Sequence, residues 1–285
     1  MFDFLRVAYI IYIITPILIT FDFSIKTKKE CLRKMCKIIY NSIGINLYRA
    51  SDMNISYEKN IIYFSNHRTF IDFCIEHIIT HYNSLFLSRW LVAFFIPLTY
   101  YCKILTNNVI FFKRKNTNIV NFENMLKLKQ QNKDGYYLMV YPEGTRRTGK
   151  NYACDLKKGV IYYSYKNDCP IQFIITYGKD DSFNEKTFVQ KKCNAYVFYS
   201  KVYRPDKEKY LNMEDWYNYI NNEWKNEFDY IYSKNYTEKD IIEKIDPDYI
   251  HDNNYPINKY ILNLSRVIFI SSFCGFLYSI IKYII

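Results

Sequence analysis

Glycine is scarce in this chain of 285 residues, and the glycine-rich loops that bind phosphate are missing. The sequence has only seven glycines, and it contains neither a G-x-G-x-x-G nor a G-K-[ST] pattern. Dinucleotide-binding domains and P-loop enzymes need these glycines because their backbone must approach a phosphate closely. The sequence therefore argues against both classes of enzyme.

Patterns typical of disulfide scaffolds and metal sites are also missing. None of the eight cysteines forms a Cys-x-x-Cys pair, and several lie in apolar surroundings, where cysteine behaves as a small buried hydrophobe. We therefore expect reduced thiols facing the cytosol. His77 and His81 are four residues apart, as metal ligands on one helix face can be, but no third ligand is evident. We expect this pair to serve packing, and we expect neither a metal ion nor a bound cofactor.

Acidic residues are fewer than basic ones, which gives the chain a formal net charge of +11 at pH 7. A basic chain favours anionic partners such as nucleic acid, acidic lipid surfaces or phosphorylated substrates. Lysine is abundant together with Asn, Ile and Tyr, which is typical of an AT-rich coding bias, so codon usage accounts for part of the excess. No zinc, helix-turn-helix or single-strand-binding signature accompanies the charge, and we therefore expect no nucleic-acid partner.

Long apolar runs lie near both ends of the chain, at 7–23 and 267–285. No small-residue cleavage site follows the first run, so we expect an uncleaved anchor there; the alternative is a core helix or a helix in the membrane interface. Basic residues follow the first run and precede the second, which places the region between them in the cytosol by the positive-inside rule. A third run, 85–101, contains Arg89 and Pro97, and we interpret it as a membrane-facing helix or acyl-chain wall, or else as an ordinary core helix.

The central region alternates between patterns typical of strands and of helices. Strands are predicted at 60–65, 108–113, 136–141, 171–177 and 194–200, and helices at 30–43, 71–81, 118–131, 155–166 and 212–231. This alternation predicts an α/β fold with a mostly parallel sheet flanked by helices. The predicted organisation is an N-terminal membrane anchor at 1–28, a catalytic domain at 29–240, and a C-terminal connection and membrane helix at 241–285.

Two polar clusters each follow a predicted strand, one beginning at Asn66 and the other at Tyr141. In α/β sheets, sites gather at the carboxyl ends of strands, so we expect the two clusters to form one site. The first cluster places Asp72 five residues after His67, which on one ideal helix is about 140° of rotation. The pair can meet only if His67 lies in the turn and Asp72 in the first helical turn. Asp72 can then accept a proton from one ring nitrogen and leave the other basic. The alternative is a turn histidine followed by an ordinary helix-start carboxylate.

Together the clusters resemble motifs of the glycerolipid acyltransferase family, the PlsC-type lysophosphatidate acyltransferases. The family's first motif, N-H-x4-D, is matched from Asn66 to Asp72. Its third motif, F-P-E-G-T-R, is matched from Tyr141 to Arg146, with tyrosine in place of phenylalanine.

Two further motifs of this family are matched in part. The second, G-x-x-F-I-x-R, corresponds to 108–114, where Asn108 replaces glycine and Arg114 matches. The fourth, a loose P-I-x-P-V, corresponds to 170–174, where Phe173 replaces the second proline. These departures concern the choice of acceptor more than the reaction.

The resemblance implies a membrane-bound enzyme of phospholipid biosynthesis. It would transfer a fatty acyl group from acyl-coenzyme A, as co-substrate, to the free hydroxyl of 1-acylglycerol-3-phosphate, giving phosphatidate. The alternatives are a lysophospholipid or lysocardiolipin acyltransferase of phospholipid remodelling, or an inactive membrane-anchored relative that binds lipid. Its partners would be lysophospholipid, acyl-coenzyme A and the bilayer of the endoplasmic reticulum or another internal membrane, with the catalytic domain facing the cytosol.

The resemblance also implies roles for individual residues. His67 would take the proton of the acceptor hydroxyl, and Asp72 would orient His67. Arg114 and Arg146 would bind the acceptor phosphate, because a guanidinium group suits phosphate oxygens. Glu143, Gly144 and Thr145 would shape that phosphate site.

Overall fold

A central sheet of eight strands organises the chain. In the computed structural model, residues 2–95, 97–112, 119–130, 136–184, 189–252 and 255–284 are described. The sheet order is β10-β1-β9-β6-β2-β5-β3-β4. Its strands are β1 (Ile45–Arg49), β2 (Ile62–Ser65), β3 (Ser84–Arg89), β4 (Val109–Phe112), β5 (Tyr137–Val140), β6 (Ile171–Tyr177), β9 (Cys193–Tyr203) and β10 (Glu243–Lys244). Two short strands, β7 (Phe183–Asn184) and β8 (Val189–Gln190), pair separately.

Most neighbouring strands run parallel. From β4 through β3, β5 and β2 to β6 every pair is parallel, as are β1 and β9, whereas β9 is antiparallel to β6 and β10 to β1. Buried parallel strands are apolar on both faces, and β2 has all four residues buried. The predicted α/β fold with a mostly parallel sheet flanked by helices is confirmed, and each predicted strand lies within three residues of its observed bounds.

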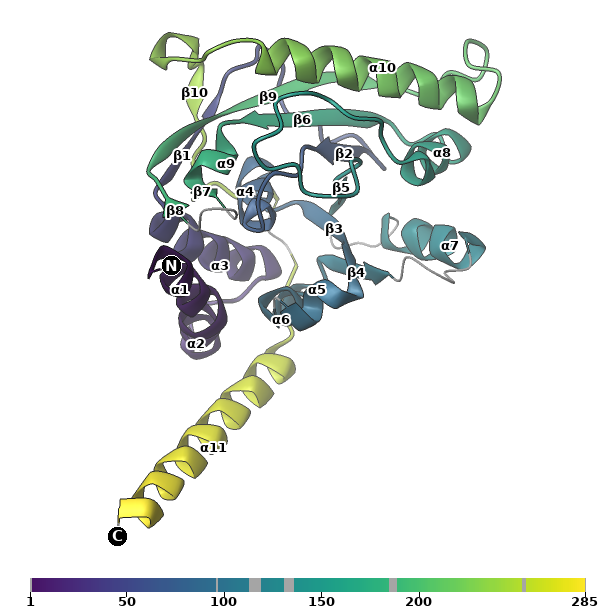
Figure 1. Cartoon of the computed structure of the whole chain (residues 1–285). Helices are drawn as coiled ribbons and strands as arrows, with labels where there is room; N and C mark the ends of the chain where they lie inside the picture. Colours follow the sequence, from purple (N-terminus) through teal and green to yellow (C-terminus); the bar gives the residue numbers. More distant parts are fainter. Residues whose placement is uncertain are drawn as a thin grey trace.

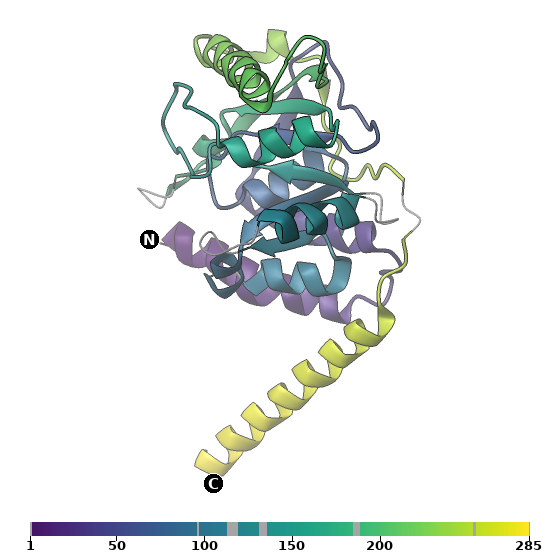
Figure 2. The ribbon, with the colours of Figure 1, turned by 90° about the vertical axis from the view of Figure 1, so that its right-hand side faces the viewer.

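Helices cover both sides of the sheet. They are α1 (Phe2–Tyr9), the π-helix η1 (Ile10–Ile14), α2 (Thr15–Phe21), α3 (Lys28–Ile43), α4 (Asp72–Ile79), α5 (Trp90–Phe95), α6 (Pro97–Thr106), α7 (Ile119–Gln130), α8 (Lys158–Lys166), α9 (Lys179–Ser182), α10 (Met213–Tyr232), the 3-10 helix η2 (Glu238–Asp240) and α11 (Lys259–Ile284). Helix α10 lies along one side, α1, α2 and α3 lie on the other, and α11 projects away from the body (Figures 1 and 2). The sharp start of α3 follows from a capping box between Thr27 and Glu30.

The prediction of a single helix at 85–101 is wrong. Ser84–Arg89 forms β3, which lies between β5 and β4 in the sheet, and separate helices begin at Trp90 and Pro97. A strand buried on both faces is a continuous apolar run, which periodicity alone does not distinguish from a buried helix. Pro97 stands at the first position of α6, where its missing N–H costs nothing.

The predicted N-terminal anchor is not found as a membrane-spanning helix, and most of the predicted C-terminal membrane helix lies outside the residues whose side chains are described. Among the residues described above, no helix has both the length and the apolar character required to cross a membrane. The run 7–23 forms α1, η1 and α2 in succession, and Val7, Ile11 and Ile19 are buried where these elements contact α3. Residues 267–284 of the second run fall within α11, in which the side chains beyond 271 lie outside the described set.

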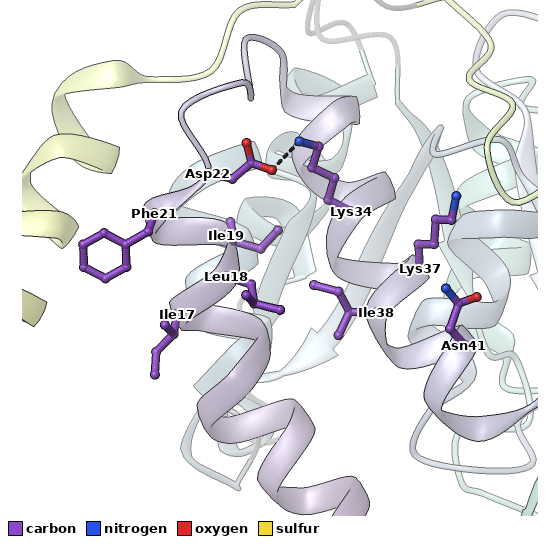
Figure 3. A pocket seen from close by; sticks show the side chains of 9 residues that line it. All are labelled: Ile17, Leu18, Ile19, Phe21, Asp22, Lys34, Lys37, Ile38 and Asn41. Atoms are coloured by element: carbon purple, nitrogen blue, oxygen red, sulfur yellow. Dashed lines mark hydrogen bonds and ion pairs between the residues drawn. The ribbon is translucent and has the colours of Figure 1, made fainter.

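A crevice of about 530 Å³ separates α2 from α3 (Figure 3). Ile17, Leu18 and Phe21 line it from α2, and the stems of Lys34 and Lys37 line it from α3. An ion pair between Lys34 and Asp22, at the end of α2, holds the two helices together beside this crevice. The N-terminal helices are therefore fixed on the domain by buried apolar contacts and by this ion pair.

Candidate active site

The site is built at the carboxyl ends of three adjacent parallel strands, β5, β2 and β6 (Figure 1). Phe64 of β2 pairs with Val140 of β5, and Ser65 pairs with Ile174 of β6, so the three strands end at one edge. The two polar clusters found in the sequence follow β2 and β5 directly, and the structure brings them together as predicted. Sequence reasoning did not identify the third contributor, the segment after β6.

His67 and Asp72 form a hydrogen-bonded pair across the turn from β2 to α4. His67 lies in the turn, Asp72 is the first residue of α4, and His67 Nδ1 lies 2.8 Å from Asp72 Oδ2. The same carboxylate oxygen accepts the backbone N–H groups of Arg68 at 2.6 Å and Thr69 at 3.1 Å. These bonds fix the carboxylate and leave Nε2 as the ring nitrogen that can take a proton. This is the arrangement that the sequence predicted, with His67 in the turn and Asp72 in the first turn of the helix.

Burial sets the protonation of this pair. The side chain of Asp72 is 1% exposed and that of His67 is 24% exposed. Burial lowers the pKa of His67 and outweighs the hydrogen bond that His67 makes to Asp72, which acts to raise it. Burial alone would raise the pKa of Asp72, but Lys179 and the bond from His67 hold it below its usual value. The pair is therefore an ionised carboxylate beside a neutral imidazole, the form that a general base requires.

The segment after β5 holds the His67 turn in place. The His67 ring stacks on Tyr141 with centroids 4.1 Å apart, and the His67 backbone N–H donates to Glu143 Oε2 at 3.0 Å. Arg147 N–H donates back to the His67 carbonyl at 2.8 Å. Burial raises the pKa of Glu143 to about 7. Glu143 thus bonds to the turn that carries His67, in addition to lying beside the turn predicted to bind phosphate.

The remaining predicted residues have different outcomes. Gly144 has a φ of +73°, the left-handed conformation that favours glycine, and it opens a turn in which Thr145 and Arg146 are exposed. The charge of Arg146 acts to lower the pKa of His67, which places its guanidinium near the base. Arg114 lies outside the described residues, so its predicted role as a phosphate ligand stays a prediction.

Three charged residues at the same edge were not predicted as site residues. Arg68 is fully buried and donates to Asp180 Oδ2 at 2.9 Å and to the Lys150 carbonyl at 2.7 Å. Lys179, the first residue of α9 after β6, is also fully buried. Arg89, the last residue of β3, donates to the Gly144 carbonyl at 3.3 Å. The sequence carried no signal for Lys179 or Arg89, because the place of Lys179 depends on β6 lying beside β2, and Arg89 ends a run that was predicted as a helix.

His77 and His81 take packing roles. Nε2 of the buried His77 lies 2.7 Å from Asn108 Nδ2, and His81 Nδ1 bonds to the Tyr57 hydroxyl. Burial lowers the pKa of His77 to about 3 and that of His81 to about 4, so both are neutral. In the described part of the chain, no group of three His, Cys, Asp or Glu side chains is placed to hold a metal ion.

Comparisons with known proteins agree with this architecture. Residues 46–176 match the family model described as Acyltransferase. Among solved structures, the fold is similar to that of the 1-acyl-sn-glycerophosphate (LPA) acyltransferase PlsC from Thermotoga maritima. The TM-score is 0.60 and the sequence identity 14%, with coverage of 83% of this chain and 96% of that chain. At this level of identity the likeness shows a shared fold. No curated protein matches the chain.

Proposed function

We propose, because residues 46–176 match the Acyltransferase family model, that the protein is a glycerolipid acyltransferase. In this proposal it transfers a fatty acyl group from acyl-coenzyme A to the free hydroxyl of 1-acylglycerol-3-phosphate and gives phosphatidate. The observation that carries the proposal is the 2.8 Å bond between His67 Nδ1 and the buried Asp72 carboxylate, at the shared end of three strands.

The proposed reaction needs only one base. Nε2 of His67 takes the proton of the acceptor hydroxyl while the hydroxyl oxygen attacks the thioester carbonyl carbon. The tetrahedral intermediate then collapses, the carbon–sulfur bond breaks, and the leaving thiolate of coenzyme A takes the proton from the imidazolium. Asp72 stabilises the imidazolium while it exists. The enzyme requires no covalent acyl intermediate and no bound cofactor, and acyl-coenzyme A serves as co-substrate.

The acceptor phosphate is assigned to the basic residues around this edge. Arg146 follows Gly144 in the exposed turn after β5, and Arg114 follows β4 in the sequence. Thr145 and the Gly144 backbone shape the turn that presents Arg146. Guanidinium groups suit phosphate because they offer two parallel N–H donors to its oxygens.

The lipid substrate implies a membrane surface. Leu5, Tyr9 and Leu18 on the N-terminal helices are each more than half exposed, and Phe23 after α2 is 75% exposed. Exposed apolar side chains gathered on one element are typical of a site that meets lipid or another protein. We assign the protein to the cytosolic surface of the endoplasmic reticulum or another internal membrane, with the bilayer as its partner and no role in binding nucleic acid.

The test is an acyl-transfer assay with labelled acyl-coenzyme A and a panel of acceptors. The panel contains lysophosphatidate, lysophosphatidylcholine, lysophosphatidylglycerol and lysocardiolipin, each in mixed micelles. We expect the fastest transfer to lysophosphatidate. A faster reaction with a lysophospholipid that bears a further headgroup would assign the enzyme to phospholipid remodelling. Failure to acylate any acceptor would reject the proposed activity.

A further inference from the structure

Lys179 approaches the His67–Asp72 pair from the segment after β6, the neighbour of β2 on the side opposite β5. Its side chain is fully buried, and its ammonium group donates to the Asn66 carbonyl at 2.5 Å and to Glu76 Oε1 at 2.5 Å. The same nitrogen lies 3.6 Å from Asp72 Oδ1. All three partners belong to the segment that begins after β2 and continues into α4, the segment that carries His67. Lys179 is therefore a charged contact between the segment after β6 and residues 66–71, which we call the catalytic loop.

Gly178 gives the backbone before Lys179 a conformation that other residues rarely adopt. Gly178 has a φ of +82°, and a Cβ at this position would lie 2.9 Å from the backbone oxygen of Asn194 on β9. Both the conformation and the close approach exclude a larger residue. The chain consequently turns sharply at the end of β6, and α9 starts at Lys179 with its side chain directed under the catalytic loop. This placement is a fixed feature of the fold.

The contacts of the two carboxylates show what Lys179 supplies. Asp72 Oδ2 takes all the hydrogen bonds described for this carboxylate, whereas Asp72 Oδ1 has no hydrogen-bond partner among the described residues and faces Lys179 as its ion-pair partner. Glu76, one turn along α4, accepts from Lys179 and from Ser65 Oγ at 2.7 Å. Two carboxylates share one buried ammonium group, and buried charges are tolerated only when they are paired in this way.

Other ionisable groups surround the same cluster. From the segment after β5 these are Tyr141, Glu143, Arg146 and Arg147, from the catalytic loop Arg68, from α9 Asp180, and from α10 Tyr232. Arg68 pairs with Asp180, and the pKa of Tyr141 and of Tyr232 is raised by burial, so both phenols stay neutral. Among the cationic groups described here, Lys179 is the one that bonds to both the catalytic loop and α4.

We propose that Lys179 is a positioning residue for acyl transfer, which keeps Asp72 charged and His67 free of its second proton so that the base works at neutral pH. The proposal rests on the proposed function of the His67–Asp72 pair and adds a third member to it. Lys179 acts through Asp72 and Glu76.

Removing the ammonium group has a defined consequence. In Lys179→Met, two buried carboxylates one helical turn apart lose their shared cation, so the pKa of Asp72 rises. The pKa of His67 also rises, because the repulsion from Lys179 is lost. Activity requires ionised Asp72 and neutral His67, so both changes move the acid limb of the pH–rate profile to higher pH. A shift of about 1 pH unit or more is expected, as is usual for the loss of a neighbouring charge.

The experiment compares full-length variants by kcat/KM as a function of pH and by thermal melting. Lys179→Met is expected to shift the acid limb upward, and Lys179→Arg to restore part of its position because the charge returns. The matched control is Lys29→Met, since Lys29 on α3 is another buried lysine, bonded to Asn83 and to the His251 carbonyl away from the site. Lys29→Met is expected to lower Tm without moving the acid limb.

A second variant covers the case in which Lys179→Met does not fold. Lys179→Met combined with Glu76→Gln removes one of the two stranded carboxylates and is expected to regain stability. The upward shift of its acid limb should be smaller than in Lys179→Met, because Asp72 lacks its cation but no longer faces a second buried carboxylate. An acid limb at the wild-type position in Lys179→Met, or in the double variant if Lys179→Met does not fold, would overturn the proposal, as would an equal shift in Lys29→Met.

A readout independent of turnover separates this proposal from the proposed function. The protein has four histidines, so the His67 resonance is assigned by its loss in His67→Ala, and its titration is followed by NMR. Lys179→Met is expected to raise the midpoint of the His67 titration. An unchanged midpoint would overturn the role of Lys179, whereas the absence of acyl transfer by wild-type protein would overturn the proposed function alone.

Discussion

Two regions of the molecule differ in which side chains they bury. One is the sheet edge formed by the ends of β5, β2 and β6, where charged side chains are buried; the other is the helical segment 2–21, where apolar side chains are exposed. At the strand ends, Asp72 and Lys179 are buried and each bonds to several partners. In the helical segment, large apolar side chains such as Leu5 and Leu18 are exposed. The first region is organised before any substrate arrives, because its bonds close within the chain. The second buries its outer face only when an apolar surface lies against it.

The largest effect is expected from removing the proposed base, His67, from the edge formed by β5, β2 and β6, which we call the organised edge. We expect His67→Ala to lower kcat by roughly 10²- to 10⁴-fold, the usual contribution of a general base. The fold should persist, because the His67 bonds to Glu143 and Arg147 use backbone atoms that alanine keeps. Acyl-transfer assays and a melting curve on the purified variant test both statements. Activity within a few-fold of wild type would exclude His67 as the base.

Arg146 tests whether the exposed turn beside that edge recognises the acceptor. We expect Arg146→Lys to lower kcat/KM for the acceptor by roughly 10- to 100-fold, since charge-assisted bonds contribute about 1.5–3 kcal/mol each and lysine lacks the planar fork. The KM for acyl-coenzyme A should change much less. Kinetics with each substrate varied in turn, together with Tm, provide the measurement. Equal losses for both substrates and a lowered Tm would indicate a structural role for Arg146.

The helical segment is tested by making its outer face polar. Leu5→Ser, Tyr9→Ser and Phe23→Ser combined should weaken partitioning to phospholipid vesicles by roughly 10- to 100-fold, because three exposed apolar side chains no longer enter the lipid. The matched control is Leu211→Ser. Leu211 is 79% exposed and precedes α10, on the other side of the sheet (Figure 1). Vesicle sedimentation gives the comparison, and equal partitioning of the triple variant and the control would refute lipid contact by this face.

A change in stability with pH tests the organised edge without any substrate. Burial raises the pKa of Glu143 from 4.5 to about 7, so the folded protein binds a proton more tightly there than the unfolded chain. Stability from this group is therefore present below pH 4.5 and is lost as the pH rises to about 7, by up to about 3 kcal/mol.

Glu143→Gln removes this titration and keeps an acceptor for the His67 N–H. Relative to wild type, its Tm should rise as the pH increases from 5 to 8. Melting curves at several pH values measure the difference, and a constant Tm offset across this range would contradict the assignment of the titration to Glu143.

The parts of this fold that the sequence predicts are those with local signals. The pairing of His67 with Asp72 follows from a strand, a turn and a helix start within one short stretch. The meeting of that stretch with Glu143 follows from the rule that parallel strands end at one edge. In both cases the prediction needs only the order of elements along the chain.

The parts that the sequence did not predict depend on neighbours in space. Strand β3 resembles a buried helix in composition, and only its place between β5 and β4 identifies it as a strand. Lys179 is an ordinary lysine in the sequence, and its role follows from the position of β6 beside β2. The N-terminal run has the composition of an anchor, but the packing of Val7 and Ile11 against the domain is set by α3.

The contact between Asn108 and His77 predicts which residues occur together at these two positions among relatives. Asn108 stands where the glycerolipid acyltransferase motif has glycine, and its amide nitrogen lies 2.7 Å from Nε2 of His77 on α4. A glycine at 108 would take this partner away from a fully buried imidazole, and another residue at 77 would leave the amide unpaired. Neither exchange is tolerable alone, so the two positions are expected to covary among relatives, with His77 present where Asn108 is present.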